Sequence, residues 1–227
     1  MNVRTSFYEQ LLDLPLFQGL GRNDFVEIAE KVKFSFFKAT SCKSVAKEND
    51  MCERLIFVLC GKIQVRSVSR DFNYELTEFI NAPLVIQPES LFGLSPQFSR
   101  TYWVDPETEY LTIPKSDVRD LLFNYPTFRI NYLNILSTQI QHSQRLLWRS
   151  TSRSIHNRFA KFLIERSSRP AGHKSLKIKM TRLAEEILDT RLNTSKMLHD
   201  LADLDLLILE RERIEIPQAE ILFQQFL

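Results

Sequence analysis

A basic segment in the second half of the chain carries the clearest chemical signal. Between Arg145 and Arg182 the sequence holds 11 lysines and arginines and a single acid, Glu165, whereas residues 183–227 hold four basic and ten acidic residues. Dense lysine and arginine clusters attract nucleic-acid phosphates in a salt-dependent manner. An ordinary solvated face fits the same pattern, so charge alone leaves both interpretations open.

Other residue types give little sign of catalysis or metal binding. The three cysteines, Cys42, Cys52 and Cys60, match neither a disulfide framework nor a metal site, and we expect buried thiols. The four histidines have no ligand spacing, and no glycine-rich phosphate loop or paired nucleophile and base is visible. We therefore expect no enzymatic activity, no metal and no certain cofactor.

A long helix is predicted from Pro126 to about Ser150, because Thr127 is typical of a helix start and no later glycine or proline interrupts the segment. Residues recur at seven-residue spacing along two lines, Leu133–Ile140–Leu147 and Leu136–Ser143–Ser150. Such a narrow seam favours the pairing of two helices in a homodimer. A long helix packed on its own domain is the alternative.

The segments on either side of this helix differ in character. Seven short β-type runs separated by turn residues predict a sandwich or barrel-like roll: 34–37, 55–59, 63–68, 75–80, 84–86, 102–104 and 110–113. After the long helix, a helix at 154–166, a strand at 176–178, helices opening at Thr181 and Thr190, and a hairpin at 206–216 predict a winged helix-turn-helix. We expect an α+β protein divided at residues 1–125, 126–152 and 153–227.

Four stretches in this order resemble the cyclic-AMP receptor protein family of transcription regulators (Crp/Fnr): LPLFQGLGRNDFVEIAE, RLIFVLCGKIQV, IPKSDVRDLLFNYP and KIKMTRLAEEILDTRLNTSKMLHDLADLDLLI. The resemblance covers nearly the whole chain. It implies an N-terminal cyclic-nucleotide-binding-type β-roll that acts as a sensor, a long dimerisation helix with a hinge, and a C-terminal winged helix-turn-helix. It also implies double-stranded promoter DNA as the partner of a homodimer, with RNA polymerase as a further candidate.

The resemblance implies a ligand pocket in the β-roll for a small-molecule effector, but this pocket is only partly retained. The family's Arg-Ser or Arg-Thr pair is present as Arg100-Thr101, whereas its Gly-Glu pair reads Pro88-Glu89, and proline has no amide proton to donate to a phosphate. We therefore expect cyclic AMP to bind weakly or not at all. An ion-paired or surface role is the alternative for Arg100. The candidate effector-binding residues are Glu89, Arg100, Thr101, Ser143 and Gln144.

The second helix of the helix-turn-helix is expected to begin after Thr190, a good N-cap. The resemblance implies that Arg191 and Lys196 contact guanine edges or phosphates, although solvated charges are the alternative. Leu192 replaces an acid that often accepts from cytosine, and Leu188 replaces the usual glycine of the turn. The candidate DNA-binding residues are Thr190, Arg191, Leu192, Ser195, Lys196, His199, Lys179 and Arg182. The nearby acids Asp189, Asp200 and Asp203 would oppose DNA if they faced it, so they are expected to point sideways or inward.

Two functions from different classes follow from these patterns. The first is a DNA-binding transcription regulator with an unknown effector; the second is a cyclic-nucleotide-fold interaction module that acts through protein partners, which the acidic residues of 183–227 also fit. Salt-dependent retention on DNA would separate them. No apolar run reaches the roughly 18 residues of a membrane span and no signal pattern opens the chain, so a cytoplasmic location without a membrane partner is expected.

Overall fold

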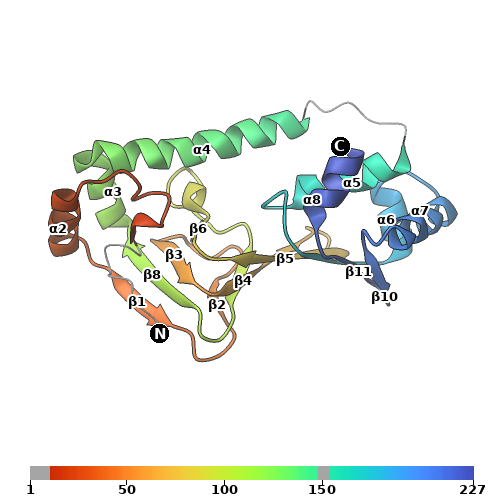
Figure 1. The fold of residues 1–227 in the computed structure, drawn as a ribbon, viewed down its shortest axis with the longest axis horizontal. Helices are drawn as coiled ribbons and strands as arrows, with labels where there is room; N and C mark the ends of the chain where they lie inside the picture. The colour runs from red at the N-terminus through yellow and green to blue at the C-terminus, as the bar shows by residue number, and fades with distance from the viewer. Residues whose placement is uncertain (1–10, 148–153) are drawn as a thin grey trace. The chain divides into compact units, whose positions relative to one another are not determined.

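The computed structural model describes residues 11–147 and 154–227, which fall into two compact units. Unit 1 lies within Met1–Ile63 and Asn81–His142, and unit 2 lies within Gln64–Ile80 and Ser143–Leu227. The predicted α+β class, with a β-roll followed by a long helix and a winged helix-turn-helix, is confirmed (Figure 1). The predicted divisions after residues 125 and 152 stay predictions.

Unit 1 is a β-roll with helices at both of its sequence ends. Its elements are α2 (Arg22–Lys31), β1 (Ser35–Lys38), β2 (Lys43–Ala46), β3 (Arg54–Cys60), the start of β4 (Lys62–Val68), β6 (Leu84–Ile86), the 3-10 helix η1 (Pro88–Ser90), β7 (Thr101–Val104), β8 (Glu109–Pro114), α3 (Lys115–Asn124) and α4 (Pro126–Leu147). One antiparallel sheet has the order β1-β8-β3-β6, and β2 pairs with β7. Among these strands, only β2 lies outside the runs predicted from the sequence.

The strand β3 lies between two neighbours in its sheet, and the burial of its side chains fits this interior position. The four consecutive residues Leu55–Val58 are all buried, as expected for a strand covered on both faces. Gly61 makes the tight turn into β4, with φ +102°. A Cβ atom at this position would lie 2.6 Å from Thr108 Oγ1 and 2.9 Å from its Cα, so only glycine fits the turn.

The first turns of α4 are anchored on the roll. The Phe128 ring lies 5.3 Å from the ring of Phe17, and both are fully buried. The Tyr132 hydroxyl donates to the Pro88 carbonyl oxygen (2.6 Å), and burial raises the pKa of this tyrosine above its usual range. Farther along the helix the seam residues Leu133 and Ile140 are 50% and 58% exposed. Ser150 and the side chain of Leu147, which belong to the predicted seam, lie outside the described residues.

Unit 2 contains the winged helix-turn-helix. Its elements are the rest of β4, β5 (Tyr74–Asn81), α5 (Ile155–Arg166), β9 (Lys174–Ile178), α6 (Met180–Glu186), α7 (Arg191–Asp203), β10 (Ile208–Glu210), β11 (Arg213–Ile216) and α8 (Ala219–Phe226). The strands lie in the order β10-β11-β9-β5. The helix α6 begins at Met180, one residue before the predicted start. The helix α8 was not predicted from the sequence; it buries Ala219, Leu222 and Phe223 in the core of the unit.

A hairpin from the β-rich half of the sequence belongs to this core. We call residues 64–80 the 64–80 hairpin; its strand β5 pairs antiparallel with β9, from Tyr74 opposite Ile178 to Glu78 opposite Lys174. Leu76 is buried in one hydrophobic cluster with Phe159 of α5. The 64–80 hairpin therefore supplies both a strand and core residues to the winged helix-turn-helix.

The cysteines correct one expectation. Cys52 is buried, which raises the pKa of its thiol to about 11, but Cys42 and Cys60 are exposed because they lie beside turns at strand ends. Within residues 11–147 and 154–227, no group of three or more His, Cys, Asp or Glu side chains could hold a metal ion. No helix in the same part of the chain is long and apolar enough to span a membrane.

Candidate nucleic-acid interface and sensor site

The turn between α6 and α7 has the geometry of a helix-turn-helix, although a leucine stands where a glycine is usual. Leu188 adopts the left-handed conformation, with φ +54°, and its side chain is 80% exposed. This backbone conformation costs a non-glycine residue roughly 1 kcal/mol or more. The Asp189 amide donates to the Ala184 carbonyl oxygen (2.9 Å), which closes α6 and directs the chain into α7.

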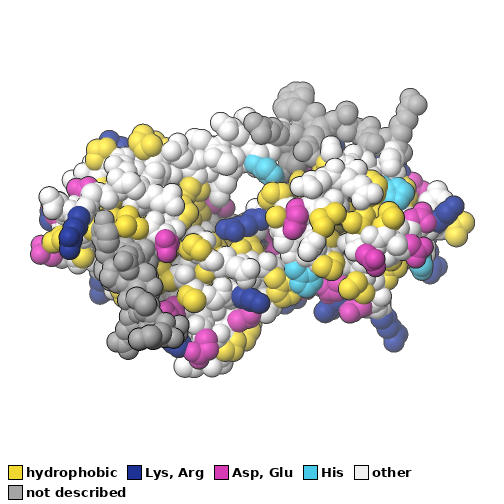
Figure 2. Space-filling view, in the orientation of Figure 1, with side chains coloured by type: hydrophobic (Ala, Val, Ile, Leu, Met, Phe, Trp, Pro, Cys, Tyr) yellow, Lys and Arg dark blue, Asp and Glu magenta, His cyan; other side chains and the backbone are white. Residues whose placement is uncertain are grey.

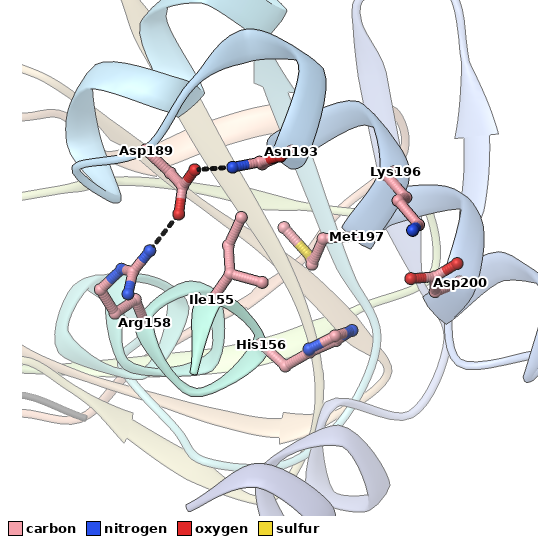
Figure 3. A pocket seen from close by; sticks show the side chains of 8 residues that line it. All are labelled: Ile155, His156, Arg158, Asp189, Asn193, Lys196, Met197 and Asp200. Carbon is pink, nitrogen blue, oxygen red and sulfur yellow. Dashed lines mark hydrogen bonds and ion pairs between the residues drawn. The ribbon is translucent and has the colours of Figure 1, made fainter. Parts of the chain in front are cut away.

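Asp189 then fixes the start of α7 against α5 (Figure 3). Its carboxylate accepts from the Asn193 side-chain amide and the Thr190 backbone amide, both at 2.8 Å, and forms an ion pair with Arg158. These contacts, that of Asn193 first, lower the pKa of Asp189. The Arg158 Nε atom also donates to the Ile187 carbonyl oxygen (2.8 Å). Arg158 and Asn193 were not predicted from the sequence, because their partners depend on how α5 packs against the turn.

Thr190 is the predicted N-cap of α7, and its hydroxyl accepts from the Asn193 backbone amide at 3.2 Å. The buried residues of the helix are Thr194, Met197, Leu198 and Leu201. With 3.6 residues per turn, positions 192, 196, 199 and 203 lie on the opposite side. We call this side, together with Arg191, the outward face of α7.

The predicted DNA-binding residues of α7 differ in their exposure and in their partners. Arg191, Leu192, Lys196 and His199 are exposed, and Ser195 is half-buried. Arg191 and Lys196 form no ion pair with any described residue, whereas His199 Nδ1 donates to the Ser195 carbonyl oxygen at 2.7 Å. The structure thus brings Leu192, Lys196 and His199 to one side of α7, with Arg191 exposed at its first position.

The acids near α7 correct a second expectation. Asp189 turns inward and Asp200 is exposed at the side of the helix, but Asp203 is exposed on the outward face itself. The helical period explains this placement, because position 203 follows position 192 by about three turns. The acid therefore stands at the far end of the helix from Arg191.

The basic segment is largely paired with acids inside unit 2. Five of its members form ion pairs, namely Arg158, Lys161, Arg166, Lys174 and Arg182. Arg182, a predicted phosphate contact, faces Asp71 of the 64–80 hairpin at 3.0 Å and Glu186 at 2.5 Å. Lys177 and Lys179 are exposed and unpaired within the described residues. Figure 2 accordingly shows basic and acidic side chains interspersed on the visible face of this unit.

An open pocket of about 320 Å³ lies beside the outward face, between α5 and α7 (Figure 3). Ile155 and Met197 contribute its apolar lining, and Lys196 and Asp200 come from α7. The ion pair of Arg158 with Asp189 occupies another side of the pocket. The Arg158–Asp189 ion pair at this pocket joins α5 to the start of α7.

The sensor-side candidates lie around η1, where the polar groups bond to each other. Gln87, in the left-handed conformation, donates from Nε2 to Ser99 Oγ (2.6 Å), and its Oε1 accepts from the Ser99 amide (3.1 Å). Glu89 Oε2 accepts from Gln139 of α4 at 3.1 Å. The carboxylate predicted for effector binding is therefore linked to the long helix. Gln87, Ser99 and Gln139 gave no recognisable sequence signal.

The other predicted effector residues are less closely gathered. Thr101 Oγ1 accepts from the Glu48 amide at 3.1 Å, and Arg100 is half-buried just before β7. Ser143 and Gln144 are exposed near the C-terminal end of α4. Pro88 is buried at the first position of η1 and, as expected, has no amide proton to offer.

The β-roll, the long helix and the winged helix-turn-helix are the architecture that the resemblance to the Crp/Fnr regulators implies. The chain is 25% identical over 198 residues to the global nitrogen regulator of Synechocystis sp., covering 81% of this chain and 85% of that protein. It is 24% identical over 198 residues to the global nitrogen regulator of Nostoc sp., covering 81% and 86%. No family model matches the sequence.

A solved structure gives the same fold. The catabolite activator protein of Thermus thermophilus superposes with a TM-score of 0.52 at 19% identity, covering 93% of this chain and 97% of that one. At this identity the match establishes the shared architecture of roll, long helix and winged helix-turn-helix. The chemistry of each site depends on the residues of this chain.

Proposed function

We propose that this Crp/Fnr-type transcription regulator binds palindromic double-stranded promoter DNA as a homodimer, with the outward face of α7 in the major groove. The observation that carries the proposal is the first turn of α7. There Arg191 is exposed and unpaired within the described residues, beside a helix start that Asp189 and Thr190 hold in place. The N-terminal residues of a recognition helix are the ones that reach base edges.

The candidate residues divide by role. Arg191 would contact a guanine edge, while Lys179, which precedes α6, and Lys196 would hold phosphates. Thr190, Ser195 and His199 would line the groove as weaker polar contacts. Arg182 can contact a phosphate only if its ion pairs with Asp71 and Glu186 break, so we assign it a smaller contribution to DNA binding than Lys179.

The exposed seam of α4 supports the homodimer. Leu133 and Ile140 lie two helical turns apart on one side of the helix and are each at least half exposed. A second α4 packed along the same line would remove this apolar surface from water, as in a coiled coil. Two subunits would then present two copies of α7 to the two halves of a palindrome.

The sensor is proposed to take a small effector other than cyclic AMP. Pro88 removes an amide donor, and Glu89 already bonds to Gln139. An effector that competes for Glu89 would act directly on α4. We place the protein in the cytoplasm with its DNA and retain RNA polymerase as a candidate partner; the proposal involves binding and no catalysis.

Titrations on specific and random duplexes at several salt concentrations test this function. Arg191→Ala should reduce the preference among duplexes, because a bidentate arginine–guanine contact contributes about 1–3 kcal/mol of discrimination. Lys179→Ala should weaken binding to every duplex and lower the salt slope by about one unit. Lys47→Ala, an exposed lysine of unit 1, is the control and should change neither.

Two results would contradict the proposal. If the wild-type protein binds no duplex better than random DNA, α7 does not read bases. Loss of affinity that is equal for all duplexes in Arg191→Ala would assign this arginine to the backbone instead. Retention on protein partners with no salt-dependent DNA binding would favour the interaction module.

A further inference from the structure

We infer that Leu192 is a specificity-determining residue that recognises thymine through its 5-methyl group, beside the guanine contacted by Arg191. This inference rests on the proposed function and deepens it by assigning a base. It starts from an apolar side chain that is 79% exposed in the first turn of α7.

The position of Leu192 distinguishes it from an incidental surface leucine. Scattered exposed apolar residues are normal on protein surfaces and need no explanation. Leu192, however, lies opposite the buried residues of α7 and therefore at the middle of the outward face. It is also in the first turn, the part of a recognition helix that goes deepest into the groove.

The side chains next to Arg191 and Leu192 in the first turn of α7 are already engaged within the protein. The Thr190 hydroxyl caps the helix, and the Asn193 side-chain amide donates to Asp189 at 2.8 Å. Thr194 is buried. The first turn therefore presents one cation and one apolar group to whatever it meets.

The chemistry of the major groove selects the base. Adenine, guanine and cytosine expose hydrogen-bonding groups there, and thymine adds a methyl group at C5. A leucine offers no acceptor for the cytosine amino group, and it gains by removing apolar surface from water. Arg191 and Lys196, which form no ion pair with any described residue, and Lys179 before α6 give the surroundings the positive charge that suits DNA.

The experiment begins with a duplex selected by the wild-type full-length protein from a random pool. Each thymine in the selected site is then replaced by uracil, which differs only in the missing methyl group. We expect one position in each half-site where uracil lowers affinity about fourfold, and about fifteenfold when both half-sites are changed, since one buried methyl carries this much free energy.

Leu192→Ala should lose this difference, so that the thymine and uracil duplexes bind equally. Leu188→Ala is the matched control, because Leu188 is equally exposed but lies in the turn before the helix. It should keep the full difference between thymine and uracil. Arg191→Ala should also keep it, while the preference for guanine at the neighbouring position is lost.

The outcomes separate this inference from the proposed function. If no duplex is selected over random DNA, the proposed function itself fails. If a duplex is selected but uracil is tolerated at every position, or if Leu192→Ala retains the wild-type response to uracil, the thymine assignment is wrong and DNA binding stands.

Discussion

The ion pair between Glu78 and Lys174 should be the interaction on which the 64–80 hairpin depends. The two residues face each other at the end of the β5–β9 pairing, and each side chain is 1% exposed. Lys174 Nζ lies 2.9 Å from Glu78 Oε1. We consider the substitution Glu78→Gln, which keeps the size of the side chain and removes its charge.

The contacts around Glu78 set the expected magnitude. Besides Lys174, its carboxylate accepts from the backbone amides of Ser168 (2.7 Å) and Arg169 (3.3 Å). Removing one partner from a buried ion pair costs about 3–5 kcal/mol, because the other charge stays buried without compensation. Lys174 retains one close acceptor, the Arg169 carbonyl oxygen at 2.8 Å. We therefore expect a loss near the lower limit, about 3 kcal/mol in the free energy of unfolding of unit 2.

Urea denaturation of the full chain, together with amide hydrogen exchange in β5 and β9, measures this loss. Glu75→Gln is the matched control on the same strand, because Glu75 pairs at 2.5 Å with the half-exposed Arg66. An exposed pair of this kind contributes at most about 1 kcal/mol. The double variant Glu78→Leu/Lys174→Met leaves no unpaired charge and should be less destabilised than Glu78→Gln.

A small effect would refute this reasoning. If Glu78→Gln costs less than about 1 kcal/mol and leaves the exchange of β9 amides unchanged, the buried pair does not hold the hairpin. If the double variant is less stable than Glu78→Gln, apolar packing cannot replace the pair and the energetic argument fails.

Two further predictions concern single positions. Leu188→Gly should raise the free energy of unfolding by up to about 1 kcal/mol, because glycine relieves the strain at φ +54°. Leu188→Val should lower the free energy of unfolding. The opposite order of stabilities in thermal unfolding would contradict the turn geometry. Ile140→Asp should convert dimers to monomers in sedimentation experiments, because it would bury two charges against each other at a cost of several kcal/mol. The control Thr138→Asp lies away from the seam and should leave dimers intact. An unchanged dimer in Ile140→Asp would disprove the seam.

Local patterns in the sequence determined most of the elements of this protein. The β-type runs fall on β1 and β3–β8 because each run carries its own apolar residues and ends at its own turn residues. Pro126 starts α4 and Thr190 caps α7 for equally local reasons. The family resemblance then gave the order of the domains. The helix α8 was missed because residues 217–227 follow a strand without a strong cap; its N-cap Gln218 makes no side-chain capping bond.

Only the tertiary structure decided which charges are free. In the sequence Lys174 and Arg182 belong to one basic segment, yet their partners Glu78 and Asp71 lie on the 64–80 hairpin. The register of β5 against β9 places Lys174 opposite Glu78, a residue 96 positions earlier in the chain, and no local pattern encodes such a register. Arg191, Leu192 and Lys196 stay at the surface because α7 buries its other side, and within the described residues neither Arg191 nor Lys196 forms an ion pair.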